Sequence, residues 1–160
     1  MTAALSPVAV CVLAGFLWSA RSDIADRNAR AADAQRAERI STDYAVGAAT
    51  LTYQDINGWV NRLKTNTTPQ LANKYDAVGI KLEQILVPLK WTSTATPVSA
   101  KVVSEQGDIY KVNVFVNVRS TTAQNPAGMQ TVATYNVTLD KNADWKISDV
   151  GGIDGALSVK

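Results

Sequence analysis

The stretch IYKVNVFVNV, residues 109–118, decides the fold of this chain. Its side chains alternate strictly between an apolar series and a mostly polar one. The apolar series is Tyr110, Val112, Val114, Val116 and Val118. This period of two predicts a β-strand that buries one face and exposes the other.

The same alternation recurs on both sides of this strand. Residues 98–102 and 133–139 alternate in the same way, and Trp145 and Ile147 mark a last short strand. Short polar turns at 106–108, 124–128 and 141–144 separate the strands. Closely spaced turns join neighbouring antiparallel strands, so the sequence predicts a strongly curved, four-stranded antiparallel sheet.

Upstream of residue 91 the apolar period changes to that of helices. The clearest helix begins at Thr68-Pro69, is closed by Pro88, and carries an apolar stripe of Leu71, Tyr75, Val78, Leu82, Ile85 and Leu89. A shorter helix with Asp55 as its cap precedes it and carries Ile56, Trp59, Val60 and Leu63. Residues 21–50 predict a third helix, with Ala37, Ile40, Tyr44, Ala48 and Leu51 on one face. Three helices followed by four strands predict an α+β domain with the helices on one face of the sheet.

The N-terminus differs from the rest because the first ionised side chain is Arg21. An apolar helix of about nineteen residues, at 1.5 Å per residue, spans roughly 28 Å, which is about the thickness of a bilayer core. We therefore divide the chain into a transmembrane anchor at 1–21, a helical stalk at 22–36, a domain at 37–150 and a flexible tail at 151–160. A cleaved signal peptide is the competing interpretation, but the first residues lack a basic group and an A-x-A site. A break in the helix near Ser22-Asp23 is an alternative to a continuous stalk.

Composition excludes several kinds of chemistry. The chain has no His and a single Cys, Cys11, which lies within the predicted anchor. This argues against His- or Cys-based catalysis, zinc sites and disulfides, and we expect neither a metal nor a cofactor. The net charge of +2 is too small and too scattered to indicate nucleic-acid binding.

The order of elements and several short stretches are similar to a known family. These stretches are LTY-x-D at 51–55, VSAKVVSEQGDIYKVNVFVNV at 98–118, YNVTL at 135–139 and DWKISDV at 144–150. Together they resemble the Mce-associated membrane proteins of mycobacteria and related actinobacteria. The resemblance implies a single-span protein with a cone-shaped domain of the nuclear-transport-factor-2-like (NTF2-like), VirB8-like type.

The same resemblance implies a role, a location and partners. Members of that family are accessory subunits of Mce systems, which import lipids such as fatty acids or sterols. The implied partners are the permease, the substrate-binding subunits and the ATPase of the transporter. The short N-terminus resembles that of orphan lipid-uptake coordinators. The family implies a domain on the periplasmic side of the plasma membrane, whereas Arg21, Arg27 and Arg30 weakly favour a cytoplasmic one; we follow the resemblance.

Two sets of residues are candidates for partner contacts. Cys11, Gly15 and Ser19 form a stripe of small side chains on one face of the anchor, which lets another transmembrane helix approach closely. On the stalk, Arg30, Arg36 and Arg39 either contact partner subunits or form internal ion pairs with neighbouring acids.

The interior of the cone offers a third candidate site. Trp59, Tyr75, Trp91 and Trp145 either line an apolar pocket or simply fill it. Related folds include ketosteroid isomerase, which uses an Asp base with Tyr donors. In this chain the tyrosines follow core periodicity and no pair of carboxylates can be placed inside, so we predict no enzymatic activity.

We therefore expect a non-enzymatic accessory subunit that stabilises an Mce-type lipid import complex. The alternatives are a VirB8-like assembly factor of a secretion or conjugation apparatus and a small domain that binds an apolar ligand.

Overall fold

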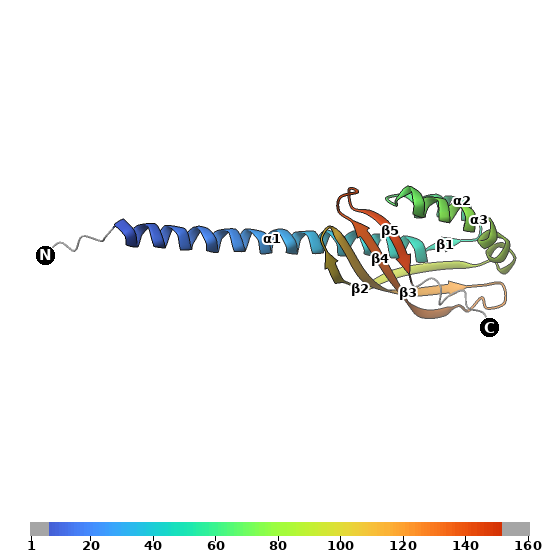
Figure 1. Cartoon of the computed structure of the whole chain (residues 1–160). Coiled ribbons are helices and arrows are strands. Elements are labelled where there is room, and N and C mark those ends of the chain that lie inside the picture. Colours follow the sequence, from blue (N-terminus) through green and yellow to red (C-terminus); the bar gives the residue numbers. More distant parts are fainter. Residues whose placement is uncertain (1–6, 152–160) are drawn as a thin grey trace. The chain divides into compact units, whose positions relative to one another are not determined.

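The computed structural model describes the backbone from residue 7 to residue 151 and the side chains from residue 24 to residue 151 (Figure 1). The elements, in chain order, are α1 (Pro7–Ala49), β1 (Leu51–Thr52), α2 (Ile56–Lys64), α3 (Pro69–Leu89), β2 (Thr92–Gln106), β3 (Ile109–Thr121), β4 (Met129–Asp140) and β5 (Lys146–Gly151). The chain divides between Gln35 and Arg36 into two compact units. Each unit is described by itself.

The first unit is the N-terminal part of α1. Its described side chains, from Ile24 onward, are exposed apart from Asp33 and Ala34, which are half-buried, as expected of a polar helix. Among the described side chains, no helix is long and apolar enough to cross a membrane. The predicted anchor at 1–21, with the side chains of Cys11, Gly15 and Ser19, lies outside the described side chains, and the tail beyond Gly151 lies outside the described residues.

The second unit is an α+β domain with a curved antiparallel sheet, as the alternation predicted. The strand order is β1-β2-β3-β4-β5, and every neighbouring pair is antiparallel. The prediction of four strands was wrong by one. The extra strand, β1, pairs Leu51 with Ser93 and Thr52 with Thr92, and two residues are too few to show a period.

Three long strands carry the curvature. β2, β3 and β4 pair over most of their length, and the β2–β3 register shifts between Pro97 and Ser99 and again between Val102 and Ser104. Each shift leaves one extra residue in β2, and such bulges bend and twist a strand.

The core forms where the inner face of the sheet meets the C-terminal part of α1. Val112, Val114 and Val116 of β3 are completely buried there. On α1, the buried positions are mostly small, and Ala37, Ser41, Ala45, Ala48 and Ala49 all belong to this face. Small side chains allow the helix axis to approach the sheet closely, so branched valines fill the space between them.

The helix ends follow the sequence only in part. The side chain of Asp55 caps α2 by accepting a 2.9 Å hydrogen bond from the amide of Gly58, as predicted. Pro69 begins α3, but the Thr68 side chain makes no capping hydrogen bond; the Thr68 amide donates instead to the Ile147 carbonyl at 2.9 Å. The helix continues one residue past Pro88 and ends with Lys90 in the left-handed region.

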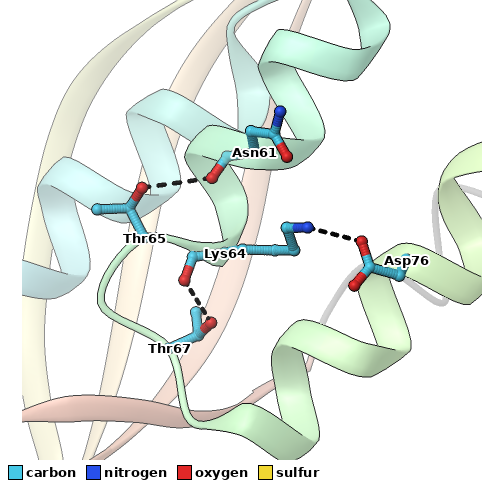
Figure 2. A network of polar contacts seen from close by, with 5 residues as sticks. All are labelled: Asn61, Lys64, Thr65, Thr67 and Asp76. Atoms are coloured by element: carbon cyan, nitrogen blue, oxygen red, sulfur yellow. Dashed lines mark hydrogen bonds and ion pairs between the residues drawn. The ribbon is translucent and has the colours of Figure 1, made fainter.

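Helices α2 and α3 are joined by polar contacts as well as by packing (Figure 2). The Lys64 ammonium lies 2.7 Å from a carboxylate oxygen of Asp76, and the Thr67 hydroxyl donates to the Lys64 carbonyl at 2.8 Å. Gly79 of α3 lies against Val60 of α2, where an added Cβ would be 3.3 Å from a Val60 methyl. These contacts fix which side of α3 faces the domain.

That side differs from the predicted apolar stripe. Tyr75, Leu82 and Leu86 pack against the core, whereas Val78 and Ile85 are 40% and 52% exposed. The stripe in the sequence is therefore wider than the surface that the domain covers, and one of its edges faces solvent.

One buried hydroxyl yields a first prediction. Ser41 on α1 is fully buried, and its oxygen has no hydrogen-bond partner among the described residues. An unsatisfied buried donor costs about 1 kcal/mol or more, so Ser41→Ala is expected to raise the free energy of unfolding by about 1 kcal/mol. Urea denaturation measures this change.

The matched control is Ala45→Ser, one helical turn further along the same buried face. It adds an unpaired hydroxyl and is expected to destabilise the domain by a similar amount. Destabilisation by Ser41→Ala would contradict the assignment, because it would mean that the hydroxyl has a partner.

Candidate functional site

The described surface contains an open groove between α1 and α2, of about 410 Å³. Its lining residues are Ile40, Asp43, Tyr44, Gly47, Arg62, Leu63, Thr65, Asn66 and Ile147. The apolar side chains come from both helices and β5, and the exposed Asp43 and Arg62 bring opposite charges to its walls. A Cβ added at Gly47 would meet nothing within 4 Å, so the groove is open there.

None of the four aromatic residues predicted for a pocket lines this groove. Trp59 is buried, and its indole N–H donates to the Ala48 carbonyl at 3.1 Å, which ties α2 to the end of α1. Trp91 is half-buried at the start of β2, and its carbonyl accepts a 2.8 Å hydrogen bond from the Tyr53 amide. The Trp59 side chain is thus part of the core, and Trp91 contributes a backbone contact to the domain.

The third aromatic residue, Tyr75, belongs to a cluster of tyrosines from three different elements. Tyr44 of α1 and Tyr75 of α3 are joined by a hydrogen bond between their hydroxyls. Tyr135 of β4 is close enough to raise the pKa of Tyr44 electrostatically. Sequence reasoning placed each tyrosine on an apolar face, but their meeting depends on the packing of α1, α3 and β4.

Burial makes these hydroxyls harder to ionise. It raises the pKa of Tyr44 and of Tyr75, and it raises that of Tyr135 to about 12. The hydrogen bond to Tyr44 partly offsets the effect at Tyr75, and the Asp149 carboxylate adds to it. The cluster consists of neutral phenols at physiological pH, and they can donate and accept hydrogen bonds.

The fourth aromatic residue, Trp145, is clamped at the turn between β4 and β5. Asp144 and Trp145 both adopt the left-handed region, with φ of 56° and 58°. The Trp145 ring lies 5.1 Å from the ring of Tyr110, and the guanidinium carbon of Arg36 lies 5.2 Å from the Trp145 centroid. The Lys141 ammonium lies 5.9 Å from the same centroid. These contacts hold an aromatic residue in a backbone conformation that bulky residues rarely adopt.

The two stretches most characteristic of the family resemblance meet at this turn. In EQGD, residues 105–108, Gly107 has a φ of 60° and Glu105 accepts a 3.3 Å hydrogen bond from the Tyr110 hydroxyl. The Asp108 carbonyl accepts from the Lys141 amide, and its carboxylate accepts from the Asn142 side chain, both at 2.8 Å. The stretch DWKISDV contributes Trp145 and the buried Ile147. Both stretches therefore build structure at this end of the sheet.

The three predicted stalk arginines differ in their surroundings. Arg36 stacks on Trp145 within its own domain, whereas Arg30 and Arg39 are exposed. Their neighbour Glu38 reaches the sheet: its carboxylate lies 3.3 Å from the Lys101 ammonium and accepts a 3.1 Å hydrogen bond from the Val102 amide. Sequence spacing along a helix does not reveal such contacts to a distant strand.

Comparisons with solved structures identify the fold. No protein-family profile matches the chain, and no curated protein matches it. The periplasmic domain of DotI is similar in structure, with a TM-score of 0.56, 11% identity and coverage of 71% of this chain and 91% of that domain. CagV, a VirB8 homologue of the type IV secretion system of Helicobacter pylori, gives a TM-score of 0.55 at 8% identity, covering 71% and 93%. An IcmL-like type IV secretion system protein of Legionella pneumophila gives 0.54 at 8% identity, covering 73% and 89%.

These similarities establish a VirB8-like, NTF2-like fold for the domain, as the sequence resemblance implied. At such low identity they show the fold alone. None of them carries the name of the Mce-associated family.

The tyrosine cluster predicts a pH effect on stability. The folded-state pKa of Tyr135, about 12, lies above the ordinary value of about 10, so the stability linked to it is present below about pH 10 and lost as the pH rises towards 12. Tyr135→Phe removes this loss. At about pH 11 the wild-type domain is expected to lose about 1 kcal/mol more, relative to neutral pH, than the variant.

Urea denaturation of both proteins at a series of alkaline pH values tests this expectation. Tyr53→Phe, which changes a tyrosine outside the cluster, is the control and is expected to follow the wild type. Parallel pH profiles for wild type and Tyr135→Phe would contradict the raised pKa.

The Trp145 contacts generate a second prediction. Arg36→Ala removes the guanidinium from the ring and is expected to cost about 0.5 to 1 kcal/mol of unfolding free energy. Arg39→Ala, at an exposed position on the same helix, is expected to change stability much less. Equal effects in chemical denaturation would show that the stacking contributes nothing.

Proposed function

We propose that this chain is a non-enzymatic assembly subunit of the VirB8-like type, which holds envelope proteins together through the surfaces of its domain. The observation that carries the proposal is the fold itself. The similar domains of DotI, CagV and the IcmL-like protein are described as periplasmic or as parts of type IV secretion systems. A tethered domain of this type works through contacts with other proteins.

The aromatic side chains that fill the interior of the domain support a role without catalysis. Trp59 and Trp145 are buried in the core, and the tyrosine cluster occupies the space where α1, α3 and β4 converge. Burial raises the pKa of the tyrosine hydroxyls, so they stay protonated to a higher pH than exposed tyrosines do. A reaction centre requires a base facing a substrate cavity, and this arrangement supplies packing instead.

The second candidate is an accessory subunit of an Mce-type lipid importer, and the sequence stretches at 98–118 and 144–150 favour it. These stretches supply residues that connect the β2–β3 turn to the β4–β5 turn. Asp108 accepts a hydrogen bond from the β4–β5 turn, and the Tyr110 ring contacts the Trp145 ring. The resemblance to the Mce-associated proteins in these stretches supports this candidate. Both candidates place the domain on the periplasmic side of the plasma membrane, anchored by residues 1–21.

A pull-down of the tagged full-length chain from its native membranes in mild detergent, followed by mass spectrometry, tests the proposal. Secretion or conjugation components are expected if the first candidate is right. Recovery of a permease, substrate-binding subunits and an ATPase would establish the Mce role instead. A chain recovered without protein partners but with an apolar ligand would overturn both.

The same experiment tests the predicted small-residue stripe. Gly15→Leu is expected to reduce partner recovery severalfold, because a large side chain keeps transmembrane helices apart. Ala14→Leu, one residue off the stripe, is the matched control and is expected to leave recovery unchanged. Equal recovery from both variants would remove the stripe as a docking face.

A further inference from the structure

Helix α3 carries four of the exposed large apolar side chains of the domain, and the others lie on β2, β3 and β4. Val78, Ile80, Ile85 and Val87 are 40%, 67%, 52% and 41% exposed, and they lie within ten consecutive residues. Single exposed apolar residues are ordinary on a protein surface, so what matters here is how these four are arranged around the helix and which charges accompany them.

These side chains form two separate flanks. With 3.6 residues per turn, Val78 and Ile85 fall on one side of the face that packs on α2, and Ile80 and Val87 fall on the other. The members of each pair are seven residues apart, which places them two turns apart on the same line of the helix. Tyr75, Gly79 and Leu82 lie between the flanks, where α3 contacts the rest of the domain.

The two flanks carry opposite charges. Lys74 and Lys81 lie beside Val78 and Ile85, and we call these four residues the basic flank. Glu83 lies beside Ile80 and Val87, and these three form the acidic flank. Lys74, Lys81 and Glu83 are exposed, and none of them has an ion-pair partner among the described residues.

We infer that the basic flank of α3 in one copy of this chain docks against the acidic flank of α3 in a second copy. Each flank offers two apolar side chains at the same spacing and a charge of the sign that the other lacks. Contact between two identical flanks would place lysine against lysine or glutamate against glutamate, which is unfavourable. An anionic lipid surface would repel the acidic flank for the same reason.

Such a contact is heterologous, since different surfaces of the two copies meet. It leaves one basic and one acidic flank free in every pair, so further copies add to form a ring or a row. Each contact is small, and tethering many copies in one membrane raises their effective concentration enough to favour it. The inference extends the proposed assembly role but does not depend on which partner proteins the chain recruits.

Disulfide cross-linking in membranes tests the inference. Two differently tagged full-length chains are co-expressed with Cys11→Ser, which removes the single natural cysteine. One chain carries Ile85→Cys, and the other carries Ile80→Cys or Val87→Cys. After mild oxidation we expect disulfides between the two tags, in clear excess over disulfides between two Ile85→Cys chains.

Val132→Cys, at an exposed position on β4, measures random collision. Cross-links mainly between identical positions would overturn the heterologous contact. Cross-linking no greater than that of Val132→Cys would overturn self-association altogether. Both results would leave the pull-down of partner proteins unaffected, so failure of this inference is distinguishable from failure of the proposed function.

A charge exchange tests the electrostatic part. Lys81→Glu in the Ile85→Cys chain is expected to lower the cross-link yield by about twofold to threefold, as loss of an exposed ion pair does. Glu83→Lys in the second chain is expected to restore the yield. An unchanged yield with Lys81→Glu, or no restoration, would overturn the pairing of the two flanks.

Discussion

The close approach of α1 to the inner face of the sheet is the constraint on which the domain depends. Ala37, Ser41 and Ala45 provide a nearly smooth helix surface, and the valines of β3 fill the space against it. The same approach brings polar groups into reach: the Ser93 hydroxyl donates to the Ala49 carbonyl at 2.8 Å, and the Trp59 indole donates to the Ala48 carbonyl. A larger residue at Ala37 or Ala45 would push the helix away and break these bonds together.

This packing also positions the aromatic side chains of the domain. Aromatic side chains occupy the points where three elements converge, and their polar atoms bond to one another or to the backbone. In both proposed roles the surfaces of the domain would contact the partner proteins. The similarity in fold to secretion-system domains and the resemblance of short stretches to Mce-associated proteins point to different machines.

The sequence was a good guide wherever a long, regular pattern existed. Alternation in residues 109–118 predicted β3 and its buried face, and Asp55 marked the start of α2. It failed for β1, which is too short to show a period, and for α3, because periodicity shows an apolar stripe but not how much of it the domain covers. It also missed contacts between distant elements, such as Arg36 on Trp145 and the joined hydroxyls of Tyr44 and Tyr75.

Two side chains reach β2, Glu38 of α1 and Thr50 directly after α1, and they have a consequence for how copies of this chain can combine. β2 pairs with β1 only at Thr92 and Ser93, so most of its outer edge is free of strands among the described residues. Such an edge invites strand addition and aggregation. Here the Ala95 amide donates to Thr50 and the Val102 amide to Glu38, while Pro97 lacks an amide hydrogen and two bulges interrupt the register. These features disfavour the addition of a further strand at this edge, so copies of the chain that meet do so through side chains without merging their sheets.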